Sequence, residues 1–137
     1  MQENLLKTSG HGAFALQYHI VFITRYRHKC LTAAMLRSMK EQLTGVCLKW
    51  RCELLEFNGE EDHVHLLVSG HPAVNLGRMV GNLKTVSARK MRSEFAAHLK
   101  PYYWKPTLWS SSYAVFSVGS TDLQTVVRYI REQESPA

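Results

Sequence analysis

The 137-residue sequence predicts an α+β fold in which two helices pack on one face of a four-stranded antiparallel sheet. Two observations predict it. Short runs rich in β-branched and aromatic residues alternate with segments of helical periodicity, in the order β-α-β-β-α-β-α. Hydrophobic residues make up 45% of the chain and charged residues 20%, which is ordinary for a globular protein with one core.

The first half of the chain contains two predicted strands separated by a helix. Residues 13–24 (AFALQYHIVFIT) are apolar and rich in strand-forming residues, so they predict a strand. A helix is predicted over residues 32–49, because apolar side chains recur through it at helical spacing: Met35, Met39, Leu43 and Val46. Residues 51–57 (RCELLEF) predict a second strand.

The second half repeats this alternation. Asn58-Gly59 predicts a hairpin turn, after which a third strand begins near Asp62. Residues 74–95 predict a second helix, because Leu76, Met79, Val80, Leu83 and Val86 lie on one side of it. Residues 113–119 (YAVFSVG) predict a fourth strand.

A last helix is predicted over about 121–134, because Thr121 and Gln124 form a capping box at its start. With this helix added, the order of elements is that of a ferredoxin-like or RRM-like sandwich. We expect residues 1–137 to form one domain. Since this fold hosts many functions, function has to be argued from particular residues.

The charge pattern favours an anionic partner. The net charge is +6, and the segment 78–105 carries seven Lys or Arg against one acid, Glu94. A second basic cluster lies at 25–29 (RYRHK). Basic groups mixed with tyrosine and tryptophan suit phosphate contacts and base stacking, but a solvated basic face beside core aromatics gives the same pattern.

Targeting and cysteine patterns point to a cytoplasmic protein. No apolar run is long enough to span a membrane, and the N-terminus lacks the apolar core of a signal peptide. The three cysteines are odd in number and lack a CxxC spacing, so we expect reduced, structural thiols: Cys30, Cys47 and Cys52.

Two histidines interrupt the third predicted strand, DHVHLLV (62–68). Side chains alternate along a strand, so His63 and His65 share one face while Val64, Leu66 and Val68 share the other. If the apolar side chains face the helices, both imidazoles lie on the open face of the sheet. There they are good ligands for one cation, although two exposed histidines without a task fit the pattern as well.

The last helix offers a further pair of polar side chains. Its apolar stripe consists of Leu123, Val126, Val127 and Ile130. Tyr129 and Gln133 are four residues apart, so they lie one above the other on the flank of that stripe. By themselves they are equally consistent with packing at the rim of the core and a solvated surface.

Together these motifs resemble the small single-tyrosine transposases of bacterial insertion sequences, the TnpA type of HUH nucleases. The REP-associated tyrosine transposases are close relatives of that group. The resemblance covers nearly the whole chain and runs through five stretches: YHIVFITRYRHKCL (18–31), DHVHLLV (62–68), NLKTVSARKM (82–91), LWSSSYAVFSVGS (108–120) and VVRYIREQ (126–133).

The resemblance implies a metal-dependent single-strand DNA endonuclease and strand transferase. It implies that His63, His65 and Gln133 bind a divalent metal, Mg²⁺ or Mn²⁺, and that Tyr129 is the nucleophile that forms a 5′-phosphotyrosine. Asp62, which precedes the first histidine, is a candidate for a hydrogen-bond partner of that histidine or for a fourth ligand.

The resemblance also implies partners. The substrate is single-stranded DNA with hairpins near the ends of an insertion sequence. Candidate DNA contacts are Arg25, Arg27, Lys84, Arg89, Lys90 and Arg92. Members of this family work as homodimers that exchange their tyrosine helices, and Gly119-Ser120 is a plausible joint for such an exchange.

Two alternatives remain at this point. A relative domesticated by its host to act on repeated palindromes would share every residue named above. A non-catalytic module that binds single-stranded nucleic acid would share the sheet topology, but it needs stacking aromatics on the central strands, where this chain has His63 and His65.

Overall fold

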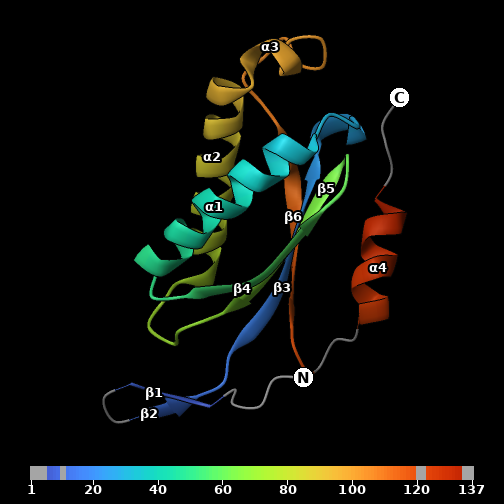
Figure 1. The fold of residues 1–137 in the computed structure, drawn as a ribbon. Coiled ribbons are helices and arrows are strands. Elements are labelled where there is room, and N and C mark those ends of the chain that lie inside the picture. The colour runs from blue at the N-terminus through green and yellow to red at the C-terminus, as the bar shows by residue number, and fades with distance from the viewer. Residues whose placement is uncertain (1–5, 10–11, 120–122, 134–137) are drawn as a thin grey trace.

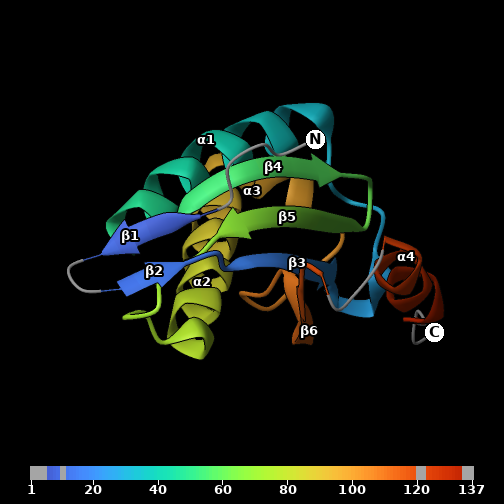
Figure 2. The same cartoon turned by 90° about the horizontal axis from the view of Figure 1, so that it is seen from below.

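The computed structural model describes residues 6–9, 12–119 and 123–133, and it confirms the predicted α+β fold (Figure 1). Four strands form an antiparallel sheet in the order β4-β5-β3-β6. Their bounds are β3 (Gln17–Thr24), β4 (Glu53–Gly59), β5 (His63–Ser69) and β6 (Trp109–Ser117). Three helices pack on this sheet, namely α1 (Ala33–Lys49), α2 (Leu76–Glu94) and α4 (Leu123–Glu132). In Figures 1 and 2, α1 and α2 cover one face, and α4 lies on the opposite face.

The alternation of side chains along β3 builds two hydrophobic clusters. Ile20 and Phe22 are fully buried in the main core under α1 and α2. The intervening Val21 and Ile23 point to the other face, where they pack with Ala114 of β6 and with Val126 of α4. Since β3 is apolar on both faces, it reads in the sequence as a continuous apolar run.

Side-chain caps fix where the two core helices begin. The Thr32 hydroxyl accepts a hydrogen bond from the Met35 amide at 3.2 Å, and Asn75 Oδ1 accepts one from the Arg78 amide at 3.0 Å. Each cap satisfies an amide that the first helical turn leaves unpaired. Both helices therefore begin within two residues of the positions that the sequence predicts.

The predicted turn at Asn58-Gly59 is wrong. Both residues belong to β4, where they lie opposite His65 and Val64 of β5, and the chain turns over residues 60–62 instead. A Cβ atom at Gly59 would lie 2.6 Å from Leu36 Cδ2, so the glycine here permits close packing against α1.

Two predicted strands have different bounds. The first is shorter than 13–24, because its start belongs to a separate two-stranded ribbon of β1 (Lys7–Ser9) and β2 (Gly12–Phe14). The fourth, β6, begins at Trp109 rather than at residue 113, since its serine-rich start pairs with the end of β3 beyond a bulge. A short helix, α3 (Ala96–Leu99), follows α2 and was not predicted.

Several remaining predictions concern single segments. The last helix spans Leu123–Glu132, and Ser120 and Thr121 lie outside the described residues, as does residue 134. All three cysteines are buried free thiols, as predicted, and burial raises the pKa of Cys47 to about 12. None of the helices in the described ranges is long and apolar enough to cross a bilayer.

Candidate active site

The two histidines of β5 lie on the face of the sheet that α4 partly covers. Val64, Leu66 and Val68 are fully buried in the main core on the other face, which confirms the predicted alternation. His63 and His65 are half-buried and point away from that core. This face of the central strands β5 and β3 carries histidines and aliphatic side chains but no Phe, Tyr or Trp, so the stacking platform of an RNA-recognition module is missing from these two described strands.

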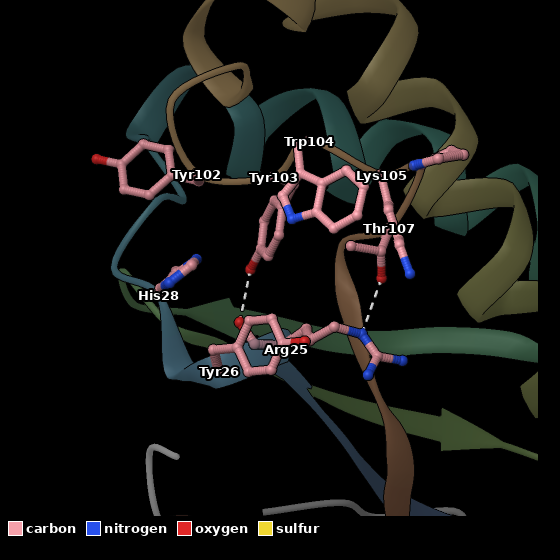
Figure 3. A pocket seen from close by; sticks show the side chains of 9 residues that line it. Arg25, Tyr26, His28, Tyr102, Tyr103, Trp104, Lys105 and Thr107 are labelled. Carbon is pink, nitrogen blue, oxygen red and sulfur yellow. Dashed lines mark hydrogen bonds between the residues drawn. The ribbon is translucent and has the colours of Figure 1, made fainter. Parts of the chain in front are cut away.

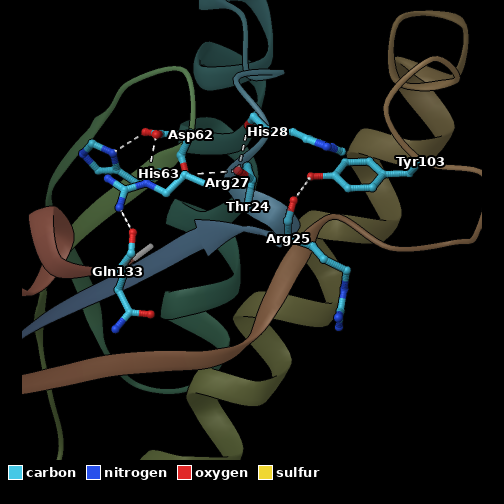
Figure 4. Close-up of polar contacts among 8 residues, drawn as sticks. All are labelled: Thr24, Arg25, Arg27, His28, Asp62, His63, Tyr103 and Gln133. Atoms are coloured by element: carbon cyan, nitrogen blue, oxygen red, sulfur yellow. Dashed lines mark hydrogen bonds and ion pairs between the residues drawn. The ribbon is translucent and has the colours of Figure 1, made fainter. Parts of the chain in front are cut away.

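A carboxylate orients His63. The Asp62 carboxylate accepts a hydrogen bond from His63 Nδ1 at 2.9 Å and one from Arg27 Nε at 3.0 Å (Figure 4). Burial by itself raises the pKa of Asp62, but the hydrogen bonds from His63 and Arg27 outweigh it, so the pKa is lowered and the carboxyl is ionised at neutral pH. With Nδ1 engaged, His63 Nε2 is the ring nitrogen that remains for a ligand.

A third histidine, which the sequence analysis missed, contacts His65. His19 Nδ1 of β3 lies 2.8 Å from His65 Nε2, and the two rings stack with centroids 4.9 Å apart. Burial and then the neighbouring His19 lower the pKa of His65, which favours the neutral form that metals bind. Only the pairing register of β3 with β5 could have revealed this contact. In that register His65 lies opposite Val21, which is two residues from His19 on the same face.

Tyr129 lies over β6 rather than over the histidines. Its ring packs edge-on against Phe116, with centroids 6.0 Å apart. Burial is the main reason why the pKa of Tyr129 is raised. Since β3 separates β6 from β5, the structure does not bring the Tyr129 hydroxyl to the His63–His65 pair.

Gln133 joins the cluster through its backbone. Its carbonyl accepts a hydrogen bond from the Arg27 guanidinium, while its side-chain amide extends away from Asp62 and His63 (Figure 4). The structure thus brings together Arg27, Asp62, His63 and the end of α4, but not the carboxamide of Gln133.

The donors on this face fit a divalent metal in part. His63 Nε2 is free for a ligand, and the His65 ring is neutral although its Nε2 is bound to His19. Within the described ranges, no three His, Cys, Asp or Glu side chains gather as a metal site. An amide oxygen is a further ligand type that suits such a mixed site.

The 3₁₀ turn η1 (Arg25–Arg27) connects this cluster to a neighbouring loop. Tyr26 and Arg27 have φ values of 60° and 55°, in the left-handed region, which costs a non-glycine residue about 1–3 kcal/mol. Hydrogen bonds hold the turn: the Thr24 hydroxyl donates to the His28 carbonyl at 2.7 Å, and the Tyr103 hydroxyl donates to the Arg25 carbonyl at 2.8 Å (Figure 4).

The basic residues of α2 that were predicted to bind DNA fall on two sides of the helix. Lys84 donates to the carbonyls of Ser110 and Ser111, at 2.8 and 3.2 Å, and burial lowers the pKa of its amine. Arg92 lines the same side, in a hollow beside the start of β6. By contrast, Arg89 and Lys90 line a hollow next to α1.

Comparison with known proteins gives consistent relatives. The model of the family described as "Transposase IS200 like" matches residues 13–133. The ISDra2 transposase TnpA of Deinococcus radiodurans is 31% identical over 122 residues, which cover 88% of this chain and 85% of that protein. The transposase of the IS200 element of Salmonella typhimurium is 28% identical over 127 residues, which cover 93% and 82%.

Two solved structures are similar as well. A Deinococcus radiodurans R1 protein assigned as a transposase superimposes with a TM-score of 0.83 at 30% identity, covering 95% of this chain and all of that one. A REP-associated tyrosine transposase bound to a REP hairpin has a TM-score of 0.56 at 10% identity, covering 90% and 68%. At 10% identity, the similarity to this second structure shows only that the two proteins share a fold.

The fold and the relatives at about 30% identity are those of a DNA transposase, an enzyme that cuts and rejoins DNA strands. Because the family model matches most of its length, the chain belongs to the IS200-like transposase family.

Proposed function

We propose that this chain cleaves and rejoins single-stranded DNA at hairpin-bearing ends of an insertion sequence, through a covalent bond between Tyr129 and a 5′ phosphate. His63, His65 and the Gln133 carboxamide would hold the divalent metal, Mg²⁺ or Mn²⁺. When bound there, the metal would withdraw charge from the scissile phosphate and so stabilise the transition state.

In the proposed chemistry, the energy of the cleaved phosphodiester bond is kept in the phosphotyrosine. The Tyr129 oxygen attacks phosphorus, the bond to the 3′ oxygen breaks, and the leaving oxygen takes a proton to become a 3′-hydroxyl. A 3′-hydroxyl of the same or another strand can then attack the phosphotyrosine, which releases Tyr129 and needs no ATP. The half-buried Asp62 carboxylate would keep His63 oriented through both steps.

One observation carries this proposal. The paired histidines face the side of the sheet on which the tyrosine-bearing α4 packs, through Val126 against Val21 and Ile23. The residues proposed as the metal-binding pair and the helix proposed to carry the nucleophile thus share one face of the sheet. The REP-associated neighbour shows that a protein of this fold can bind a DNA hairpin.

The proposal places the active site between two chains. Tyr129 packs on β6, and the Gln133 carboxamide extends away from His63, so α4 in this position does not complete the histidine pair of its own chain. In a homodimer that exchanges α4, each tyrosine would serve the histidines of the other subunit. Gly119, with φ at +101°, adopts a conformation that favours glycine at the start of the connecting segment.

The test is formation of a covalent adduct with labelled single-stranded DNA from the flanks of the gene. We expect an adduct in the presence of Mg²⁺ or Mn²⁺, and none with Tyr129→Phe, which loses only the hydroxyl. Tyr18→Phe is the matched control and should still form the adduct, because Tyr18 packs against the main core on the other face of β3. An adduct of normal yield with Tyr129→Phe would exclude this residue as the nucleophile.

A further inference from the structure

A cavity of about 630 Å³ lies next to the active-site candidate, between η1 and the loop that follows α3 (Figure 3). Trp104 and Tyr103 lie on one side of it, and Tyr26 and Arg25 lie on the other. None of the described residues that line it is acidic. Its volume is in the range of roughly 300–1,000 Å³ that is typical of sites for small organic groups.

The wall of this cavity is built by contacts within the protein. The His28 ring packs against three tyrosines, with centroids 5.7 Å from Tyr26, 5.7 Å from Tyr102 and 5.0 Å from Tyr103. On the other side, Arg25 Nε donates to Thr107 Oγ1 at 3.0 Å. A wall that is ordered in advance costs a ligand little conformational entropy.

The groups in the cavity that are available to contact a ligand are one large aromatic ring and two cations. Trp104 is 88% exposed, although it is the largest side chain at the cavity. Lys105 Nζ lies 4.8 Å from the centroid of its ring. The terminal guanidinium nitrogens of Arg25 make no hydrogen bond within the described part of the chain. A flat face beside two cations matches a nucleobase and its phosphate.

The turn η1 links this cavity to the proposed site of cleavage. Its first residue, Arg25, lines the cavity, and its last residue, Arg27, makes the ion pair with Asp62, which orients His63. The three-residue turn η1 therefore has the cavity at one end and the proposed site of cleavage at the other.

We propose that this cavity binds one unpaired nucleobase of the DNA strand next to the cleaved phosphate. The base stacks on Trp104, and Arg25 and Lys105 bind its phosphate. This inference rests on the proposed function, and it adds a place where the sequence of the strand is read outside any hairpin.

The test is a double-mutant cycle between protein and DNA. The probe is a labelled single-stranded oligonucleotide from the flanks of the gene, with one abasic site moved along it position by position. We expect Trp104→Ala to weaken binding about 5- to 150-fold, the usual value of one base–aromatic stack. One abasic position should weaken wild type by a similar factor and leave Trp104→Ala unaffected, because the same stack is lost only once.

Two further variants complete the design. Trp104→Phe keeps a ring and should recover most of the affinity, whereas Leu48→Ala, which removes another exposed side chain (64%) on α1, should bind like wild type. Full affinity of Trp104→Ala, or additive losses at every abasic position, would overturn the base site while a normal Tyr129 adduct leaves the proposed function standing. A wild-type protein that neither binds this DNA nor forms the adduct would overturn both.

Discussion

At the scale of single residues, His63 and His65 differ in what holds them. Asp62 fixes the first through Nδ1, whereas the second shares Nε2 with His19. We expect His63→Ala and His65→Ala each to abolish measurable binding of Mn²⁺ and to slow cleavage by about 10³-fold or more, the usual cost of losing a metal's Lewis-acid role. Binding to hairpin DNA should change little.

Isothermal calorimetry with Mn²⁺ measures the affinity directly. His71→Ala is the matched control, since His71 follows β5 at the end opposite His63, and it should bind Mn²⁺ like wild type. Equal affinity in wild type and both β5 variants would mean that the pair holds no metal.

At the scale of elements, the predicted DNA contacts on α2 lie on two different sides of the helix. Arg92 lies beside the start of β6 and the loop that bears Trp104, while Arg89 lies beside α1. We expect Arg92→Ala to flatten the slope of log K against log salt by about 0.7, one phosphate contact to a single strand. Arg89→Ala should leave the slope unchanged. The measurement is fluorescence anisotropy of a labelled strand over a salt series, and the reverse pattern would move the DNA path to the α1 side.

At the scale of the whole molecule, exchange of α4 predicts complementation. A Tyr129→Phe subunit keeps an intact histidine pair, and a His63→Ala subunit keeps an intact tyrosine. If the sites are shared, one site of a mixed dimer combines both intact parts, so we expect co-expressed mutants to recover part of the cleavage that each lacks alone. The other site carries both lesions and stays inactive. Verified mixed dimers that stay fully inactive would show that each chain completes its own site.

The sequence by itself determined the order of the core elements and which side chains of β5 lie on which face of the sheet. Periods of two and of 3.6 residues are local properties, and Val64, Leu66 and Val68 leave His63 and His65 only one face. It misplaced the turn at Asn58-Gly59, because the close packing of Gly59 against Leu36 depends on a helix far away in the chain. It also missed the serine-rich start of β6, whose partner is the end of β3.

Only the tertiary structure decided which polar groups meet. The contacts His19–His65, Arg27–Asp62 and Arg27–Gln133 span 46, 35 and 106 positions of the chain, and no local pattern encodes them. The same holds for the cavity beside Trp104, whose walls come from η1 and from the loop after α3. Residue types and periodicity follow from the chain, whereas distances between side chains follow from how the sheet brings β3, β5 and β6 together, because strand pairing joins segments that are remote in sequence.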